Sequence, residues 1–136
     1  MKIVLDSGAK MPTRAYGASV GYDLYAMEGQ VVSAKESANF NTGVHIELPP
    51  NTAGILISKS GLNANHGITS TGLIDPEYVG EIRVTLHNHS GYDYTVEAGD
   101  KISQLLIVPV LTPELELVDS LEETERGTKG FGSSGR

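Results

Sequence analysis

Hydrophobic and polar residues alternate along several short stretches of the chain. In residues 44–48, Val44, Ile46 and Leu48 lie on one side of the alternation and polar residues lie on the other. Residues 81–88 repeat the pattern, with an apolar residue at every second position up to Leu86. A period of two with one apolar side is typical of a β-strand that is buried on one face. Both stretches are therefore predicted to be half-buried strands.

Other stretches have the same strand character, and turn-forming residues separate them. The further predicted strands are residues 2–6, 53–59, 93–99, 101–108 and 114–118. Residues that favour turns, such as Gly, Pro, Asn and Asp, occur at 27–29, 49–51, 90–91 and 98–100. One short helix is predicted within residues 60–67. Many short strands at fairly even spacing favour an all-β sandwich, jelly roll or small barrel.

Composition narrows the class of protein. The chain has 136 residues, of which 39% are hydrophobic, and this suits one domain with one core. It has no apolar run near the ~18 residues of a membrane span and no apolar leader at its start, so a cytoplasmic protein without a membrane partner is expected. The absence of cysteine excludes disulfides and thiolate chemistry. A net charge of −7 without a basic cluster argues against nucleic acid as a partner.

The composition changes after Ser120. Residues 121–126 contain three glutamates, and the remainder is largely glycine and serine with one aromatic residue, Phe131. Such a segment cannot bury enough apolar surface to fold alone. The chain is therefore predicted to have a β domain over residues 1–120 and a flexible glycine-rich arm over residues 121–136. Taken alone, this arm has the character of an ordinary disordered terminus.

A second segment with unusual chemistry is residues 72–88, with the sequence GLIDPEYVGEIRVTLHN. Pro76 presets a turn and keeps Asp75 out of a helix. Strand-like sequence follows Gly80, so the segment is predicted to be a β-hairpin that presents Asp75 and Tyr78 near its tip. Turn statistics alone favour an Asp-Pro turn without a chemical role.

Five separated segments together resemble the trimeric dUTP pyrophosphatases, in the order in which that family has them. They are SVGYDLYA (19–26), SKSGL (58–62), GLIDPEYVGEI (72–82), HNHSGYDYTVEAGDKISQLLI (87–107) and RGTKGFGSSG (126–135). The third and fifth are the most specific. The resemblance implies an all-β, jelly-roll-like distorted barrel or sandwich with a flexible C-terminal arm. It also implies a homotrimer with active sites shared between subunits, and hydrolysis of dUTP to dUMP and pyrophosphate with Mg²⁺ on the triphosphate.

The resemblance assigns roles to the hairpin residues. Asp75 would be the general base that aligns and activates the water attacking the α-phosphorus. The ring of Tyr78 would pack against the deoxyribose and leave no room for a 2′-hydroxyl, which rejects UTP. Uracil is read in this family mainly by backbone groups, which correspond here to Gly72, Leu73 and Ile74.

A second group of residues would bind the phosphates and the metal. Lys59, Ser60 and Gly61 would supply a charge, a hydroxyl and a backbone N–H beside the start of the short helix. Gln104 would donate to the phosphates as well. Asp23 would hold Mg²⁺ indirectly, through water, because oxygen ligands and retained waters suit this ion.

The arm would become a lid that orders over the bound nucleotide. Arg126 offers a planar fork for the γ-phosphate. Phe131 would stack on uracil, a contact typically worth ~1–3 kcal/mol. Gly132 lets the backbone approach closely, and Ser133 and Ser134 add donors to the phosphates.

The sequence departs from the family's pattern in three places. Lys59 stands where the family usually has arginine, and lysine keeps the charge but loses the bidentate geometry. The stretch between His66 and Asp75 is short, so the outer arm of the hairpin and its contacts to the base are expected to differ. Ser133 and Ser134 stand where Ser-Thr is more usual, which is a mild change.

Three other hypotheses stay open on the sequence. A dCTP deaminase has a similar fold and ligand but uses a differently placed glutamate, and Asp75, Tyr78 and the Phe131 tail favour dUTP hydrolysis instead. Some members of the family, particularly in phages, are nucleotide-gated regulators, so a dUTP-gated binding protein with a regulatory protein partner is the second. A structural jelly roll without chemistry is the third.

Overall fold

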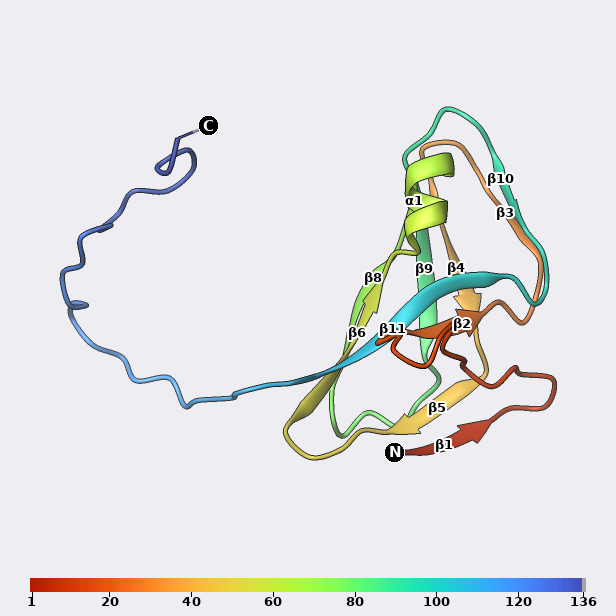
Figure 1. Cartoon of the computed structure of the whole chain (residues 1–136), viewed down its shortest axis with the longest axis horizontal. Coiled ribbons are helices and arrows are strands. Elements are labelled where there is room, and N and C mark those ends of the chain that lie inside the picture. Colours follow the sequence, from red (N-terminus) through yellow and green to blue (C-terminus); the bar gives the residue numbers. More distant parts are fainter. Residues whose placement is uncertain (136) are drawn as a thin grey trace.

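The computed structural model describes residues 1–135, and these form a β-rich body from which a long C-terminal segment extends (Figure 1). Residue 136, the last of the predicted arm, lies outside the described residues. The strands are β1 (Lys2–Leu5), β2 (Tyr22–Tyr25), β3 (Gln30–Val32), β4 (Ser37–Asn41), β5 (Val44–Glu47), β6 (Thr52–Ile57), β7 (Ile68–Thr69), β8 (Thr71–Ile74), β9 (Arg83–Asn88), β10 (Tyr94–Val96) and β11 (Lys101–Pro109), and the helix is α1 (Ser60–His66).

The strands form four antiparallel sheets. The largest has the order β2-β11-β6-β8, and the next has the order β4-β9-β7. Two pairs, β1 with β5 and β3 with β10, complete the body. The prediction of an all-β, jelly-roll-like fold is confirmed, as a set of packed sheets that do not close into a barrel over residues 1–135.

The core is built from the alternating apolar residues of the sequence. Val44 and Ile46 of β5 and Val84 and Leu86 of β9 are almost fully buried, whereas the residues between them are more exposed. They join one buried cluster with side chains from the rest of the body: Leu24, Ala26, Val32, Phe40, Leu48, Leu56, Ile68, Ile74, Ile82, Val96, Ile102 and Leu105. Burial of each large apolar side chain contributes about 1.5–3 kcal/mol. This burial is why both alternating stretches form the strands that were predicted.

The helix α1 follows β6 directly and confirms the short helix predicted within residues 60–67. It ends at Gly67, whose φ of 65° lies in the left-handed region that glycine adopts without strain. The Gly67 N–H closes the helix by donating to the Asn63 carbonyl at 3.0 Å. The described residues include no helix that is long and apolar enough to span a lipid bilayer.

The strand predicted at residues 114–118 does not form, so this prediction was wrong for the single chain. The last strand, β11, ends at Pro109, and the chain then runs away from the body (Figure 1). Leu115 is 98% exposed and Leu117 is 100% exposed. An alternating stretch forms a strand only where it can pair with a sheet edge and pack its apolar side against a surface. Residues 114–118 pair with none of the sheets formed by residues 1–135. The extended segment therefore begins before residue 121.

The hairpin predicted over residues 72–88 does not form, so this prediction was wrong: its two arms, β8 and β9, do not pair with each other. Strand β7 pairs with the end of β9, but β8 pairs with β6 instead. The two arms of the hairpin therefore belong to different sheets. As a result, the outer edge of β8 has no strand partner within residues 1–135, and the chain crosses from one sheet to the other through the loop at 75–82.

Candidate active site

An open pocket lies between the two arms, beside the unpaired edge of β8. Its lining consists of Leu73, Ile74, Asp75, Tyr78, Glu81 and Arg83. Asp75 is the exposed residue that follows β8, and its carbonyl accepts from the Tyr78 N–H at 3.1 Å, which closes the turn. An unpaired strand edge presents backbone donors and acceptors to a ligand. This pocket can therefore bond a planar ring that carries an N–H and a C=O on one side.

The side chain of Tyr78 folds back over its own turn. Its hydroxyl donates to the Glu81 carbonyl at 2.8 Å. A Cβ atom on Gly80 would lie only 2.6 Å from Cζ of the tyrosine ring, so this position requires glycine for the ring to lie as it does. Tyr78 as a whole stays 45% exposed and lines the pocket, so it is available to a ligand.

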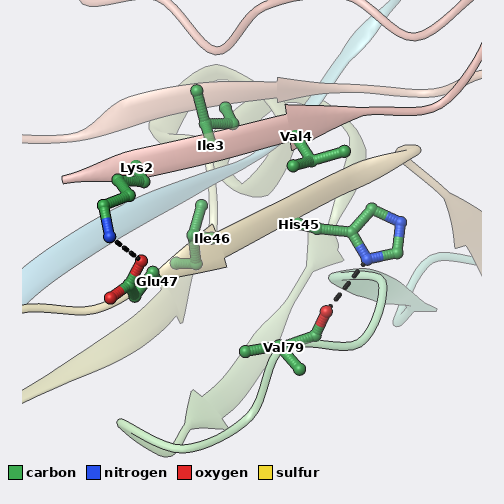
Figure 2. A pocket seen from close by; sticks show the side chains of 7 residues that line it. All are labelled: Lys2, Ile3, Val4, His45, Ile46, Glu47 and Val79. Carbon is green, nitrogen blue, oxygen red and sulfur yellow. Dashed lines mark hydrogen bonds and ion pairs between the residues drawn. The ribbon is translucent and has the colours of Figure 1, made fainter.

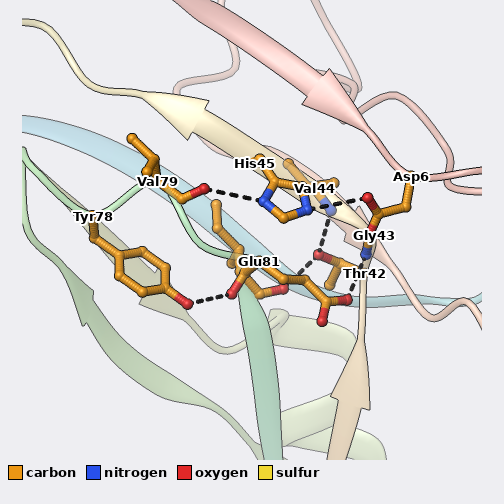
Figure 3. A network of polar contacts seen from close by, with 9 residues as sticks. Asp6, Thr42, Gly43, Val44, His45, Tyr78, Val79 and Glu81 are labelled. Atoms are coloured by element: carbon orange, nitrogen blue, oxygen red, sulfur yellow. Dashed lines mark hydrogen bonds and ion pairs between the residues drawn. The ribbon is translucent and has the colours of Figure 1, made fainter.

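The far end of the loop is bound to the corner between β4 and β5 (Figure 3). The carboxylate of Glu81 accepts from the Gly43 N–H at 2.9 Å. The Thr42 hydroxyl donates to the Ile82 carbonyl, and the Ile82 N–H donates to the Val44 carbonyl at 2.8 Å. These bonds fix residues 81 and 82, whereas Asp75 lies at the other, more exposed end of the loop.

A second pocket lies where β2, β11 and the end of β6 meet. Its lining consists of Ala15, Ser19, Val20, Gly21, Asp23, Lys59 and Gln104. Asp23 and Gln104 are direct partners in the antiparallel register of β2 and β11. Lys59 precedes α1, whose first residues, Ser60 and Gly61, carry backbone N–H groups that no preceding helical turn can accept. Lys59 thus brings a positive charge into the hollow, and the hydroxyl and N–H groups of Ser60 and Gly61 follow it directly in the chain, although neither residue lines the pocket.

Asp23 is almost fully buried in this pocket and is paired with two lysines. Nζ of Lys59 lies 2.5 Å from one carboxylate oxygen, and Nζ of Lys101 lies 2.8 Å from the other. Burial raises the pKa of Asp23, but the hydrogen bonds from Lys101 and Lys59 outweigh it and hold the pKa below its usual value. The hydrogen bond to Asp23 likewise raises the pKa of Lys101. Asp23 is therefore an ionised carboxylate between two ammonium groups.

Magnesium fits this pocket only if substrate phosphates supply some of its ligands. Over residues 1–135, no three His, Asp or Glu side chains gather to hold a metal ion by themselves. One carboxylate is nevertheless sufficient for Mg²⁺ that is carried by substrate phosphates and keeps several waters. Each oxygen of Asp23 bonds to one lysine. A carboxylate has about four lone-pair sites, so Asp23 can also accept from a metal-bound water.

Buried hydroxyl groups tie the elements of this pocket together. The hydroxyls of Ser70 and Ser103 lie 2.8 Å apart, and Ser103 also donates to the Ile57 carbonyl at 3.0 Å. The Ser70 N–H donates to the hydroxyl of Ser58 at 2.9 Å. The end of β6, the joint between β7 and β8, and β11 are thereby fixed relative to one another, just behind Lys59.

The predicted lid residues lie in neither pocket. Phe131 is fully exposed, and Arg126 Nε donates to the Lys129 carbonyl at 3.0 Å within the arm itself. Gly132, Ser133 and Ser134 are exposed in turns near the end of the arm, far from the body in Figure 1.

The structure therefore divides the predicted site residues into three separate groups. In the register of β6 and β8, Ile57 lies opposite Thr71 and Gly54 lies opposite Ile74. Lys59 consequently follows one end of this strand pair and Asp75 follows the other. At about 3.3 Å per residue, their separation along the strands is roughly 13 Å or more. One chain does not bring its base, its phosphate-binding residues and its lid together.

Lys101, Glu81 and Arg83 contribute to these pockets although sequence reasoning did not single them out. Lys101 and Glu81 lie inside the fourth and third of the five segments, so a signal for them was present. Arg83 donates across the strands to the Asn41 side chain at 3.1 Å. Which side chain each of these residues contacts depends on how the strands are aligned with one another. That alignment cannot be read from any one segment of the sequence.

Comparison with known proteins gives the family of the chain. A sequence profile of the dUTPase family matches residues 7–135. The chain belongs to the dUTPase family. All of the predicted site residues lie within the matched range, and the resemblance seen in the five segments is confirmed.

Relatives in the dUTPase family are similar over almost their whole length. The deoxyuridine 5′-triphosphate nucleotidohydrolase of Clostridium acetobutylicum is 42% identical over 134 residues, which cover 96% of this chain and 92% of the relative. The enzyme of the same name from Kluyveromyces lactis is 38% identical, with 100% of this chain and 94% of the relative covered.

Solved structures of phage dUTPases share the fold. The dUTPase of Staphylococcus bacteriophage 80alpha with dUpNHpp is 32% identical with a TM-score of 0.92, and 99% of this chain and 98% of that chain are covered. A mutant dUTPase from phage phi11 of S. aureus, described as revealing the coordination of a structural Mg(II) ion, is 29% identical with a TM-score of 0.81. It covers 90% of this chain and 98% of its own.

Proposed function

We propose that the protein hydrolyses dUTP to dUMP and pyrophosphate, in the cytoplasm as the sequence leads us to expect. The observation that carries the proposal is the match of the dUTPase family over residues 7–135. The relative from C. acetobutylicum is named for this activity, and the phage 80alpha relative holds a dUTP analogue. A dCTP deaminase is disfavoured, because the family that matches is the dUTPase family.

Asp75 is the general base of the proposed reaction. It follows the unpaired edge of β8, so a uracil bonded to the backbone of Gly72, Leu73 and Ile74 would bring its sugar and α-phosphate toward this residue. The attacking water gives a proton to the Asp75 carboxylate while its oxygen bonds to the α-phosphorus and the bond to the departing pyrophosphate breaks. A carboxylate is a weak base, so correct alignment of the water supplies much of the effect.

Tyr78 selects the deoxyribose. Its ring is held in place by the hydrogen bond of its hydroxyl to the Glu81 carbonyl and keeps an exposed face in the same pocket as Asp75. A sugar packed on that face has no space for a 2′-hydroxyl, so UTP is rejected by a steric clash.

Lys59, Ser60, Gly61 and Gln104 bind the triphosphate, and Asp23 holds Mg²⁺ through water. Magnesium, when bound, neutralises negative charge on the triphosphate oxygens. Lys59 is paired with Asp23 in the structure at 2.5 Å, and the phosphates provide a competing anionic partner for its ammonium group. The transfer of Lys59 from Asp23 to phosphate would leave one carboxylate oxygen more open to a metal-bound water, while Lys101 stays paired with the other oxygen.

The protein acts as a homotrimer in which each site is shared between subunits. The separation of the three groups of site residues within one chain supports this arrangement. The exposed Leu115, Leu117 and Leu121 support it as well, because an apolar row in water calls for a partner surface. Arg126, Phe131, Gly132, Ser133 and Ser134 of one subunit then close over a site formed by others.

Pyrophosphate release from dUTP, dTTP, UTP and dCTP tests the proposed reaction. We expect rapid release from dUTP and little from the other three. Equal rates on all four nucleotides, or the appearance of dUTP from dCTP, would contradict the proposal.

Subunit complementation tests the shared sites. An Asp75→Asn chain and a chain truncated after Thr124 are each expected to be inactive when produced alone. When the two are refolded together, mixed trimers contain some sites with an intact base, an intact phosphate pocket and an intact arm, so activity returns. If both variants stay inactive together while assembling normally, each site belongs to one chain.

A dUTP-gated regulatory role is the second candidate. The description of the 80alpha relative says that phage dUTPases control transfer of virulence genes by a proto-oncogenic G protein-like mechanism. The exposed arm of this chain could report nucleotide binding to a protein partner. Affinity capture with the whole protein, with and without dUpNHpp, tests this role: capture of the same proteins in both samples contradicts gating by nucleotide.

A further inference from the structure

His45 lies on β5, behind the loop that carries Asp75 and Tyr78. Figure 2 shows it beside Val79, and Figure 3 shows its ring between that loop and Asp6. Nδ1 lies 3.1 Å from the Val79 carbonyl oxygen, and Nε2 lies 3.2 Å from a carboxylate oxygen of Asp6. The side chain is 27% exposed, so solvent reaches the ring only in part.

Both partners of the His45 ring are hydrogen-bond acceptors. A backbone carbonyl can only accept, and an ionised carboxylate can only accept. A neutral imidazole has one N–H, whereas the imidazolium ion has two. The two contacts are therefore satisfied together only when His45 is protonated. The bond to Val79 and the bond to Asp6 both raise the pKa of His45.

The surroundings of the ring favour the charged form. Asp6, in the segment after β1, faces Nε2, and Glu81 of the loop adds a second negative charge nearby. Lys2 of β1 and Glu47 of β5 line the neighbouring groove but pair with each other at 2.9 Å, so they largely cancel. The net local charge around His45 is negative.

His45 contacts the loop at the carbonyl oxygen of Val79. The other bonds from the body reach residues 81 and 82, at the end of the loop that is farther from Asp75. Tyr78 is bonded to Val79 through one peptide, and Gly80, which follows, is the flexible residue of the loop. A bond at the Val79 carbonyl therefore fixes the part of the loop that Gly80 would otherwise let swing.

We infer that His45, as an imidazolium, is a positioning residue for the proposed reaction: it clamps the 75–80 loop through Val79 and so fixes Tyr78 and Asp75 in the pocket. This inference rests on the proposed function for its effect on rate. The clamp is complete below the usual histidine pKa of about 6.5 and is lost as the pH rises through the higher pKa of the folded protein. Above that pH the ring keeps one N–H, which Val79 and Asp6 must compete for.

The rate of dUTP hydrolysis and the titration of His45 are measured on the whole protein between pH 5 and 9. In the wild type, we expect the kcat for dUTP to fall about three- to tenfold on the alkaline side, the size of one ordinary hydrogen bond. The NMR signal of the His45 ring, assigned from its disappearance in His45→Gln, should titrate at the same pH, above 6.5.

Three variants separate a clamp from a merely structural histidine. His45→Gln can donate to Val79 but cannot titrate, so its alkaline fall should disappear. Asp6→Asn removes the facing charge, so the fall should move to lower pH. His87→Gln is the matched control, because that ring bonds to Ser37 at 2.7 Å on another sheet, and the wild-type profile should persist.

Hydrogen exchange of the loop distinguishes failure of this inference from failure of the proposed function. The protection of amides 77–80 against exchange, after correction for the intrinsic base-catalysed rate, should fall in the wild type as the pH rises through the His45 pKa. In His45→Gln this protection should show no such step. If the wild type does not hydrolyse dUTP but shows this exchange pattern, the proposed function fails and the clamp stands. The clamp is overturned if His45→Gln keeps the wild-type pH profiles of kcat and exchange.

Discussion

The two pockets of the body are held in place by different forces. Asp23 is buried, and its neighbours are fixed by strand pairing and by two lysine contacts of 2.5 and 2.8 Å. Asp75 is exposed on a loop that joins two sheets, and hydrogen bonds to residues 79, 81 and 82 restrain it from behind. A change in the first pocket therefore acts mainly on folding stability, and a change in the second acts mainly on rate.

The arm differs from both pockets, because no strand pairing with the body restrains its residues up to 135. Its described residues beyond Leu111 are exposed, and the Phe131 side chain is fully exposed. Such a segment can be ordered by a ligand at the time of binding, at a cost in conformational entropy. Substitutions in the three regions distinguish a buried carboxylate held charged by two lysines, a base placed by a loop, and a lid placed by substrate.

Asp75→Asn gives the largest expected effect. Loss of the general base should lower kcat for dUTP by about 10²–10⁴-fold, while dUpNHpp binding and thermal stability change little. Glu77→Gln, an exposed carboxylate two residues away that does not line the pocket, is the control and should keep its activity. A near-normal rate in Asp75→Asn would remove this residue from the mechanism.

Asp23→Asn should destabilise the fold. Removal of a buried carboxylate from two charged hydrogen bonds costs about 1.5–3 kcal/mol, measured by urea unfolding at pH 7. Glu47→Gln, which breaks the exposed pair with Lys2, should cost only about 0–1 kcal/mol. Equal losses in both variants would show that burial does not decide the strength of the Asp23 contacts.

The pH dependence of stability gives a second check on Asp23. Its pKa is lowered in the folded protein, so its contribution is present above the unfolded pKa of about 3.9 and is lost as the pH falls through the folded value. Unfolding free energies between pH 2 and 7 should therefore fall more steeply toward acid in the wild type than in Asp23→Asn. Parallel curves would contradict this assignment.

Phe131→Ala should weaken the reaction without weakening the body. Loss of a stacking contact of ~1–3 kcal/mol corresponds to a decrease in kcat/KM for dUTP of about 5- to 150-fold. The melting temperature and the oligomeric state should stay unchanged, because the ring is fully exposed. A lower melting temperature or a dissociated oligomer would make Phe131 a structural residue instead.

Lys59→Arg gives the smallest expected effect. Arginine keeps the charge and adds a bidentate fork, so KM for dUTP should fall or stay within about fivefold, a change below roughly 1 kcal/mol. Lys2→Arg, outside the pocket, is the control. A rise in KM of more than about tenfold would mean that the compact ammonium between Asp23 and the phosphates is required.

The sequence by itself determined the elements that a pattern within one short stretch of residues specifies. Strands β5 and β9 follow from alternation at residues 44–48 and 82–88, because one face of each must leave water. The short helix follows from its position before Gly67, and the identity of the family follows from five segments. Asp75 and Tyr78 also fall in one pocket, as expected, since only two residues lie between them.

Only the tertiary structure decided which edges and side chains meet. Strand β8 pairs with β6 and not with β9, residues 114–118 find no sheet edge, and Asp23 meets Lys101 across the register of two strands. His45 likewise contacts Val79 and Asp6, which lie far from it in the sequence. These contacts join residues far apart in the chain, and their geometry depends on the packing of all four sheets at once. A local pattern specifies which face of a strand is apolar, but not the neighbour that covers it.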